Sequence, residues 1–97
     1  MRAEIYVSGR VQHVGFRRFA RNAAERFGVR CNPINLRDTR VFVIAEGSQE
    51  ALWVFIEELK KGPVFAYVED VHYTFMEPTG NLEKPSSDSN SRQYWQY

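Results

Sequence analysis

The chain has 97 residues, enough for one small domain with a modest hydrophobic core. Hydrophobic residues make up 43% of the sequence, and the 13 basic and 12 acidic side chains nearly cancel. This balance does not favour nucleic acid or an anionic membrane as a partner. The single cysteine, Cys31, cannot build a disulfide framework or a thiolate metal site. The sequence contains no long apolar segment and therefore predicts neither a membrane span nor a secretory signal. We expect a cytoplasmic protein.

The N-terminal segment predicts a strand followed by a helix. Residues 3–8 alternate between two faces, which is the period of a strand. From residue 16 onward, apolar side chains recur at steps of three and four, which is the period of one helical face: Phe16, Phe19, Ala20, Ala23 and Phe27. Gly28 is expected to end this helix, because glycine tolerates the left-handed backbone of a C-cap.

The middle of the chain predicts two strands, a second helix and a further strand. Residues 29–36 read as a weaker strand, and Pro33 places it at a sheet edge because proline lacks the N–H donor. Residues 40–46 form a strong strand pattern, and residues 66–76 form a long one. Between them, a helix capped by Ser48 carries an apolar stripe made of Leu52, Phe55, Ile56 and Leu59.

The C-terminal part changes character after the last long strand. Residues 79–91 form a polar loop, and residues 92–97 return to aromatic side chains that suit a short closing strand. We therefore expect a single domain over residues 1–97. The order β-α-β-β-α-β predicts an α+β fold, the ferredoxin-like sandwich. In it, two helices cover one face of an antiparallel sheet.

The stretch GRVQHVGFRR, residues 9–18, joins the first strand to the first helix. Backbone N–H groups of such a loop and of the first helical turn can converge on one point and bind phosphate. Arg17 lies in that first turn and offers a planar fork for two phosphate oxygens. On spacing alone, Arg17 is equally well read as a solvated surface residue. The loop is not a nucleotide P-loop, because no Lys-Ser or Lys-Thr pair follows the second glycine.

The segment VSGRVQHVGFRRFA closely resembles the signature of the acylphosphatase family. The resemblance continues in order through INLRD, VFVIAEG, FIEELKKGP, VEDV and EPTG, up to Gly80. It implies the ferredoxin-like fold and hydrolysis of acyl phosphates without a metal, cofactor or covalent intermediate. It also implies that Arg17 holds the phosphate and that Asn35 orients the attacking water. The backbone amides that the resemblance assigns to the phosphate are those of Val11, Gln12, His13, Val14, Gly15 and Phe16.

The lack of other catalytic groups in the sequence agrees with that chemistry. We find no metal-ligand spacing, no nucleophile–base pair and no acid beside the loop. A site of this kind positions and stabilises a phosphoryl group without protonating its leaving group. A carboxylate needs no such help, since its conjugate acid has a pKa of about 4. We therefore expect an acyl phosphate and inorganic phosphate as the small-molecule partners of a monomeric protein.

Five positions depart from the family pattern near the site. His13 replaces a loop glycine, and a left-handed backbone there would strain a histidine by roughly 1–2 kcal/mol. Its ring either crowds the cradle, points outward harmlessly or adds a donor to the phosphate. Residues 31–33, Cys-Asn-Pro, precede Asn35 where the family has other residues, and Thr39 occupies a turn position that is usually glycine. These changes are expected to affect the rate more than the fold.

Several alternatives stay open. The chain is either an active hydrolase or a module that binds phosphate or another small anion with little turnover. An RNA-binding domain would share the topology, but the aromatic K/R-G-F-G-F-V type of strand is missing. Cys31 is favoured as a packing residue over a nucleophile, and His72 as a surface residue on a strand.

Overall fold

The computed structural model describes residues 1–85 and places six elements in the predicted order. They are β1 (Arg2–Arg10), α1 (Phe16–Phe27), β2 (Arg30–Asn35), β3 (Val41–Glu46), α2 (Gln49–Lys61) and β4 (Tyr67–Met76). The predicted closing strand 92–97 and the end of the predicted polar loop 79–91 lie outside the described residues.

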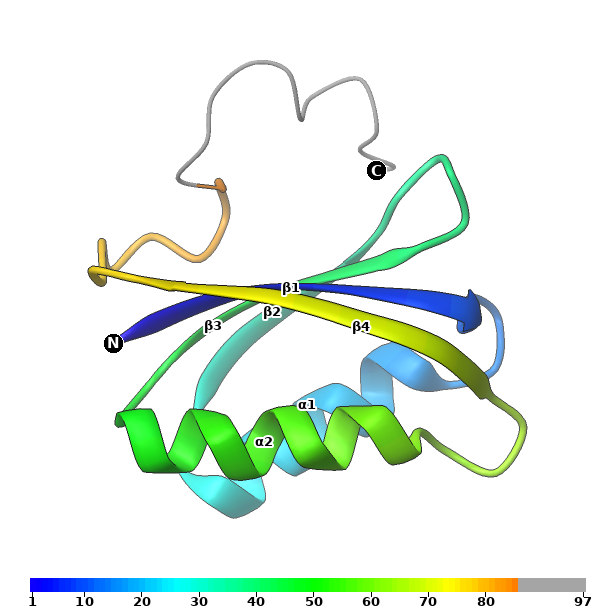
Figure 1. Cartoon of the computed structure of the whole chain (residues 1–97), viewed down its shortest axis with the longest axis horizontal. Helices are drawn as coiled ribbons and strands as arrows, with labels where there is room; N and C mark the ends of the chain where they lie inside the picture. Colours follow the sequence, from blue (N-terminus) through cyan, green and yellow to red (C-terminus); the bar gives the residue numbers. More distant parts are fainter. Residues whose placement is uncertain (86–97) are drawn as a thin grey trace.

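The four strands form one sheet in the order β2-β3-β1-β4, and every neighbouring pair is antiparallel. Both helices cover the same face of this sheet (Figure 1). This arrangement confirms the predicted ferredoxin-like α+β sandwich. Because β2 is an outer strand, Pro33 sits where a missing ladder donor is tolerated, as predicted.

The main core lies between the helices and the sheet. Alternate residues of β1 point toward the helices, so Ala3, Ile5 and Val7 are fully buried. The helices supply the opposite wall of the core, with Phe16, Ala20, Ala23, Leu52, Phe55, Ile56 and Leu59. Burial of each large apolar side chain contributes about 1.5–3 kcal/mol, so this layer fixes the positions of both helices.

Local signals end the helices where the sequence predicts. Gly28 adopts φ 73° at the C-cap of α1, and its N–H bonds back into the last turn. Ser48 caps α2, since its Oγ accepts a 3.1 Å hydrogen bond from the N–H of Ala51.

The opposite face of the sheet is partly covered by residues 77–85, which we call the C-terminal strap. In Figure 1 the strap turns back from the end of β4 across the face that carries no helix. Leu82 of the strap packs on a second, smaller apolar cluster that contains Phe42 and Ile44 of β3. The strap therefore has an apolar anchor on β3.

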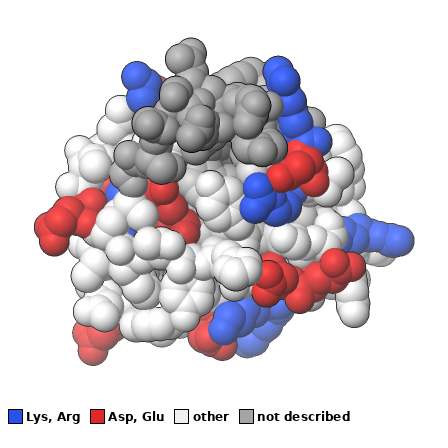
Figure 2. All heavy atoms as spheres, turned by 45° about the horizontal axis from the view of Figure 1, so that its top comes forward, with Lys and Arg blue, Asp and Glu red and all other residues white. Residues whose placement is uncertain are grey.

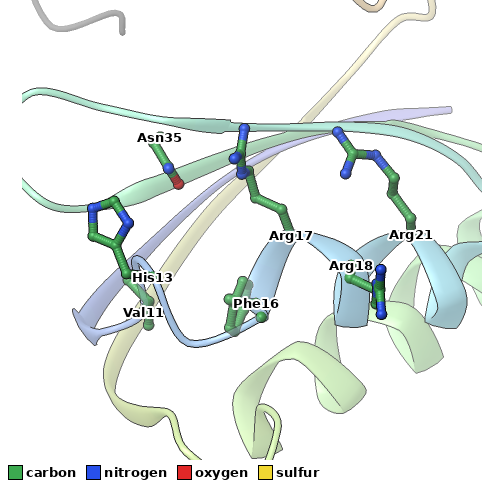
Figure 3. Close-up of a pocket in the computed structure, with 8 residues that line it drawn as sticks. Val11, His13, Phe16, Arg17, Arg18, Arg21 and Asn35 are labelled. Atoms are coloured by element: carbon green, nitrogen blue, oxygen red, sulfur yellow. The ribbon is translucent and has the colours of Figure 1, made fainter.

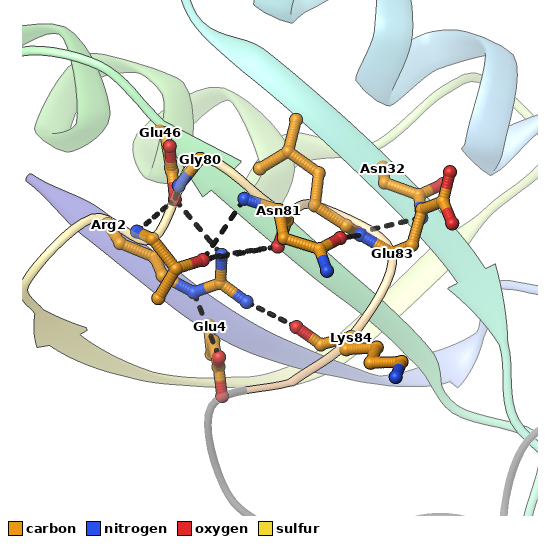
Figure 4. Close-up of polar contacts among 10 residues, drawn as sticks. Arg2, Glu4, Asn32, Glu46, Gly80, Asn81, Glu83 and Lys84 are labelled. Atoms are coloured by element: carbon orange, nitrogen blue, oxygen red, sulfur yellow. Dashed lines mark hydrogen bonds and ion pairs between the residues drawn. The ribbon is translucent and has the colours of Figure 1, made fainter.

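A buried arginine holds the strap from the other side (Figure 4). Arg2 is 0% exposed and forms ion pairs with Glu4 at 3.1 Å and Glu46 at 3.0 Å. The same guanidinium donates to the hydroxyl of Thr79 at 2.9 Å and to the carbonyl of Asn81 at 2.8 Å. Elsewhere on this side of the molecule, acidic and basic side chains are interspersed (Figure 2).

Burial of Glu46 opposes its charged form, but hydrogen bonds from the Thr79 N–H and from Arg2 outweigh that effect. The pKa of Glu46 is therefore lowered from its ordinary value. The carboxylate stays charged at neutral pH, as its buried arginine partner requires.

Candidate active site

A backbone irregularity near the end of β1 precedes the loop between β1 and α1. The pairing of β1 with β4 shifts register between Ser8 and Gly9, and Gly9 adopts φ 121°. A Cβ atom on Gly9 would lie 2.2 Å from the carbonyl oxygen of Tyr67, which no side chain tolerates. Glycine is therefore required here, because β4 passes directly against the end of β1.

The loop backbone forms a concave surface of N–H groups. His13 and Gly15 both adopt left-handed conformations, with φ 63° and φ 82°. The cap and turn hydrogen bonds of residues 1–85 include none donated by the N–H groups of Gln12 to Arg18. Left-handed residues alternating with others turn successive N–H groups toward one point, the geometry of an anion nest. No side chain caps α1, so its first-turn N–H groups are also free of protein acceptors.

Buried contacts fix this loop on the sheet and helix. Val11 and Phe16, at its two ends, are each only 1% exposed and belong to the main core. Between them, Nε2 of Gln12 donates to the carbonyl oxygens of Leu36 at 2.7 Å and Arg40 at 2.9 Å. The Gln12 side chain thus ties the loop to the β2–β3 turn, a role that the sequence analysis missed.

The loop, α1 and β2 enclose a cavity of about 230 Å³ (Figure 3). Its walls are formed by Val11, His13, Gly15, Phe16, Arg17, Arg18, Arg21 and Asn35. The structure thus brings Arg17 and Asn35 to the same cavity although they lie on different elements. Gln12 and Val14, whose amides the resemblance assigned to the phosphate, do not line it.

The cavity is strongly positive. Arg17, Arg18 and Arg21 are exposed, and within residues 1–85 none of them forms an ion pair. Arg17 and Arg21 extend side by side toward β2, whereas Arg18 points away from Asn35 (Figure 3). The first turn of α1 contains no acidic residue, and no carboxylate belongs to the described cavity wall. The N-terminus of α1 and the three arginines therefore both attract an anion.

Asn35, the last residue of β2, has the one buried side-chain oxygen or nitrogen without a hydrogen-bond partner in residues 1–85. The unpartnered atom is Oδ1. A buried acceptor left unpaired costs about 1–3 kcal/mol, so such groups usually bind water or a ligand. The amide lies on the same side of the cavity as the guanidinium of Arg17 (Figure 3). It is therefore placed to accept a hydrogen bond from a molecule in the cavity.

Two residues that depart from the family pattern, His13 and Thr39, have left-handed backbones. The left-handed backbone strains His13, and its ring lines the cavity rather than pointing away. Thr39 is also left-handed, with φ 80°. Desolvation by burial raises the pKa of the Cys31 thiol to about 11, which fits the packing role. His72 is exposed on β4, 3.1 Å from Asp70.

Neither a metal centre nor a membrane helix is found in the described part of the chain. No three His, Cys, Asp or Glu side chains of residues 1–85 gather as metal ligands. No helix there is long and apolar enough to cross a membrane.

Comparison with known proteins identifies the family. The acylphosphatase family model matches residues 3–85. An acylphosphatase of Thermus thermophilus is 47% identical over 74 residues, which cover 76% of this chain and 84% of the relative. The crystal structure of acylphosphatase from Bacillus subtilis superposes with a TM-score of 0.73 at 40% identity, covering 75% of this chain and 81% of that one. The phosphate- and nucleotide-bound structure of full-length HypF gives a TM-score of 0.73 at 26% identity over 79% of this chain, but only 10% of HypF. The chain belongs to the acylphosphatase family.

Proposed function

We propose that the protein hydrolyses acyl phosphates, the mixed anhydrides of a carboxylic acid and phosphoric acid, in the cavity between the loop and β2. The guanidinium of Arg17 and the free N–H groups of the loop bind the phosphate. Asn35 orients the water that attacks phosphorus. The observation that carries this proposal is the buried, unpartnered Oδ1 of Asn35 beside a cavity lined by Arg17.

The residues of the cavity fit one type of displacement. Water attacks phosphorus, the bond between phosphorus and the acyl oxygen breaks, and a carboxylate and inorganic phosphate leave. The proton lost by the water goes to phosphate or solvent, because no carboxylate lies in the described cavity wall. Charge on the phosphoryl oxygens is stabilised by Arg17 and by N–H donors that are already in place, which is where such sites gain most of their rate.

The residues that line the cavity also determine which leaving group can depart. A carboxylate leaves unprotonated, since its conjugate acid has a pKa of about 4, whereas an alkoxide needs an acid. None of the residues that line the described cavity is a carboxylic acid. We therefore expect simple phosphate esters to be hydrolysed far more slowly than acyl phosphates.

A second function, anion binding with little turnover, is favoured by one observation. His13 has a left-handed backbone and its ring lines the cavity. A ring at this place reduces the room for a phosphoryl group and its attacking water. In this alternative the site retains phosphate but releases it without reaction.

Hydrolysis of acetyl phosphate by three proteins separates the two functions. The wild type should exceed the uncatalysed rate, and Arg17→Ala should lose about 10³-fold in kcat/KM. Asn35→Ala should lower kcat more than it raises KM, because it acts on the water. Arg26→Gln, on the same helix but outside the cavity lining, is the control. A wild-type rate equal to the uncatalysed rate, together with saturable phosphate binding, would instead support the binding module.

A further inference from the structure

A second cavity of about 520 Å³ adjoins the first and shares Arg17 and Arg21 with it. It runs along the free edge of β2, where Asn32, Pro33 and Ile34 form its floor. The remaining wall comes from the C-terminal strap, through Glu83 and Lys84. A phosphate held by Arg17 in the first cavity would thus have the second cavity directly beside it. The size is sufficient for a small organic group.

The strap wall is held by bonds on both sides of Glu83. Nδ2 of Asn32 donates to the carbonyl of Leu82 at 2.9 Å, and the buried Arg2 donates to the carbonyl of Lys84 at 2.5 Å (Figure 4). The side chain of Asn81 accepts a 2.9 Å hydrogen bond from the N–H of Glu83. These contacts fix the backbone from which the two charged side chains extend. The wall is therefore part of the folded structure.

The charges of the second cavity favour an anion. Three cationic side chains, Arg17, Arg21 and Lys84, face one carboxylate, Glu83. Within residues 1–85 neither Arg21 nor Lys84 forms an ion pair or donates a side-chain hydrogen bond. If Arg17 is engaged by the reacting phosphate, Arg21 and Lys84 remain as two cations for one further negative group.

We infer that the second cavity receives the acyl group, and that Arg21 and Lys84 select acyl phosphates whose acyl chain ends in a second anionic group. This inference rests on the proposed hydrolysis. Arg17 and Arg21 are four residues apart on α1, which places their Cβ atoms about 5–6 Å from each other. A spacer of about two methylene groups spans that distance. Glu83 opposes the second anion and so limits its binding.

The test compares succinyl phosphate with acetyl phosphate, which differ by a terminal carboxylate on a short spacer. The ratio of their kcat/KM values should favour succinyl phosphate in the wild type. Arg21→Gln and Lys84→Gln should each lower this ratio about threefold to fivefold, as expected for exposed ion pairs. Glu83→Gln should raise it, and Arg26→Gln should leave it unchanged. Misfolding would not lower the ratio in Arg21→Gln and Lys84→Gln and raise it in Glu83→Gln, so these opposite changes exclude misfolding as the cause.

Two failures are distinguishable. If the wild type hydrolyses both compounds but the ratio is the same in all four variants, the second cavity does not select the acyl group, while the proposed function stands. If the wild type hydrolyses neither compound, the proposed function fails. The binding of acetylphosphonate and succinylphosphonate, measured by calorimetry, then decides the selectivity. Tighter succinylphosphonate binding that Lys84→Gln weakens supports the charge pairing, and equal binding of the two overturns it.

Discussion

Nε2 of Gln12 donates a 2.7 Å hydrogen bond to the carbonyl of Leu36, the residue that follows Asn35. A second bond, 2.9 Å to the carbonyl of Arg40, completes the attachment of the loop to the β2–β3 turn. The two halves of the cavity, the loop with its N–H groups and the end of β2 with its amide, are thus joined through one side chain. In the proposed reaction, the relative placement of the phosphate and of the attacking water depends on these two hydrogen bonds.

Replacement of Gln12 by alanine tests whether these two hydrogen bonds position the reactants. Both hydrogen bonds are lost, which should lower the free energy of unfolding by about 1–2 kcal/mol. Because a displacement of about 1 Å between reacting groups costs about 10²-fold, kcat for acetyl phosphate should fall by 10- to 100-fold. Chemical denaturation and steady-state kinetics measure the two effects. An unchanged kcat in a folded Gln12→Ala protein would show that the two hydrogen bonds of Gln12 do not position the reactants.

Replacement of His13 by glycine should stabilise the protein and raise its activity. The left-handed backbone at φ 63° strains a histidine by about 1–2 kcal/mol, and part of this is offset by the greater chain entropy of glycine. We expect a net gain of about 0.5–1 kcal/mol in the free energy of unfolding. With the ring removed from the cavity, kcat/KM for acetyl phosphate should increase.

Thr39→Gly is the matched control for this change. Thr39 has φ 80° but does not line the cavity, so the same substitution should give a similar gain in stability and no gain in activity. Equal activity changes in the two variants would assign the effect to general stability. A lower activity of His13→Gly alone would mean that the imidazole assists the reaction.

The buried Arg2–Glu46 pair predicts a dependence of stability on pH. The pKa of Glu46 in the folded protein is lowered from 4.5, so the folded state binds fewer protons than the unfolded state in that range. The contribution of Glu46 is complete above about pH 4.5 and is lost as the pH falls through the folded pKa. Thermal unfolding of Glu46→Gln should show a shallower loss of stability below pH 4.5 than the wild type, from a lower starting value. Parallel curves would contradict this assignment.

Cys31 should react slowly with alkylating reagents. Burial raises the pKa of its thiol to about 11, so the nucleophilic thiolate is scarce at neutral pH. The alkylation rate of the folded protein should rise steadily with pH up to about 11, and Cys31→Ser should hydrolyse acetyl phosphate like the wild type. Rapid modification at pH 7 with loss of activity would contradict the packing role.

Elements with local signals were predictable from the sequence, and contacts between distant segments were not. Ser48, Gly28 and Pro33 each predict their own surroundings because a cap or an edge position depends on a few neighbouring residues. The burial of Arg2 depends on partners in the C-terminal strap, 77 to 82 positions away, so no local pattern predicts it. For the same reason, the second cavity was missed, since Glu83 and Lys84 lie in a segment predicted only as a polar loop.

The residues of the candidate site also differ in whether the sequence predicts them. Arg17 and Asn35 were expected because the family resemblance assigns them, and the fold brings both to one cavity. The side chain of Gln12 was overlooked, because its contribution comes from a turn that is 24 to 28 positions later in the chain. A glutamine within a loop of free N–H groups gives no signal of such a contact by itself.

Titration with inorganic phosphate, followed through the amide chemical shifts, tests directly whether Arg17, the N–H groups of the loop and Asn35 meet at one anion. We expect saturable shifts at the backbone N–H groups of residues 12–18 and at the side-chain amide of Asn35. Arg17→Ala should weaken the binding about 10- to 100-fold, as expected for loss of a charge-assisted pair of hydrogen bonds. Chloride at the same ionic strength should produce no such pattern. Shifts confined to other parts of the chain, or an affinity that Arg17→Ala leaves unchanged, would contradict phosphate binding at this site.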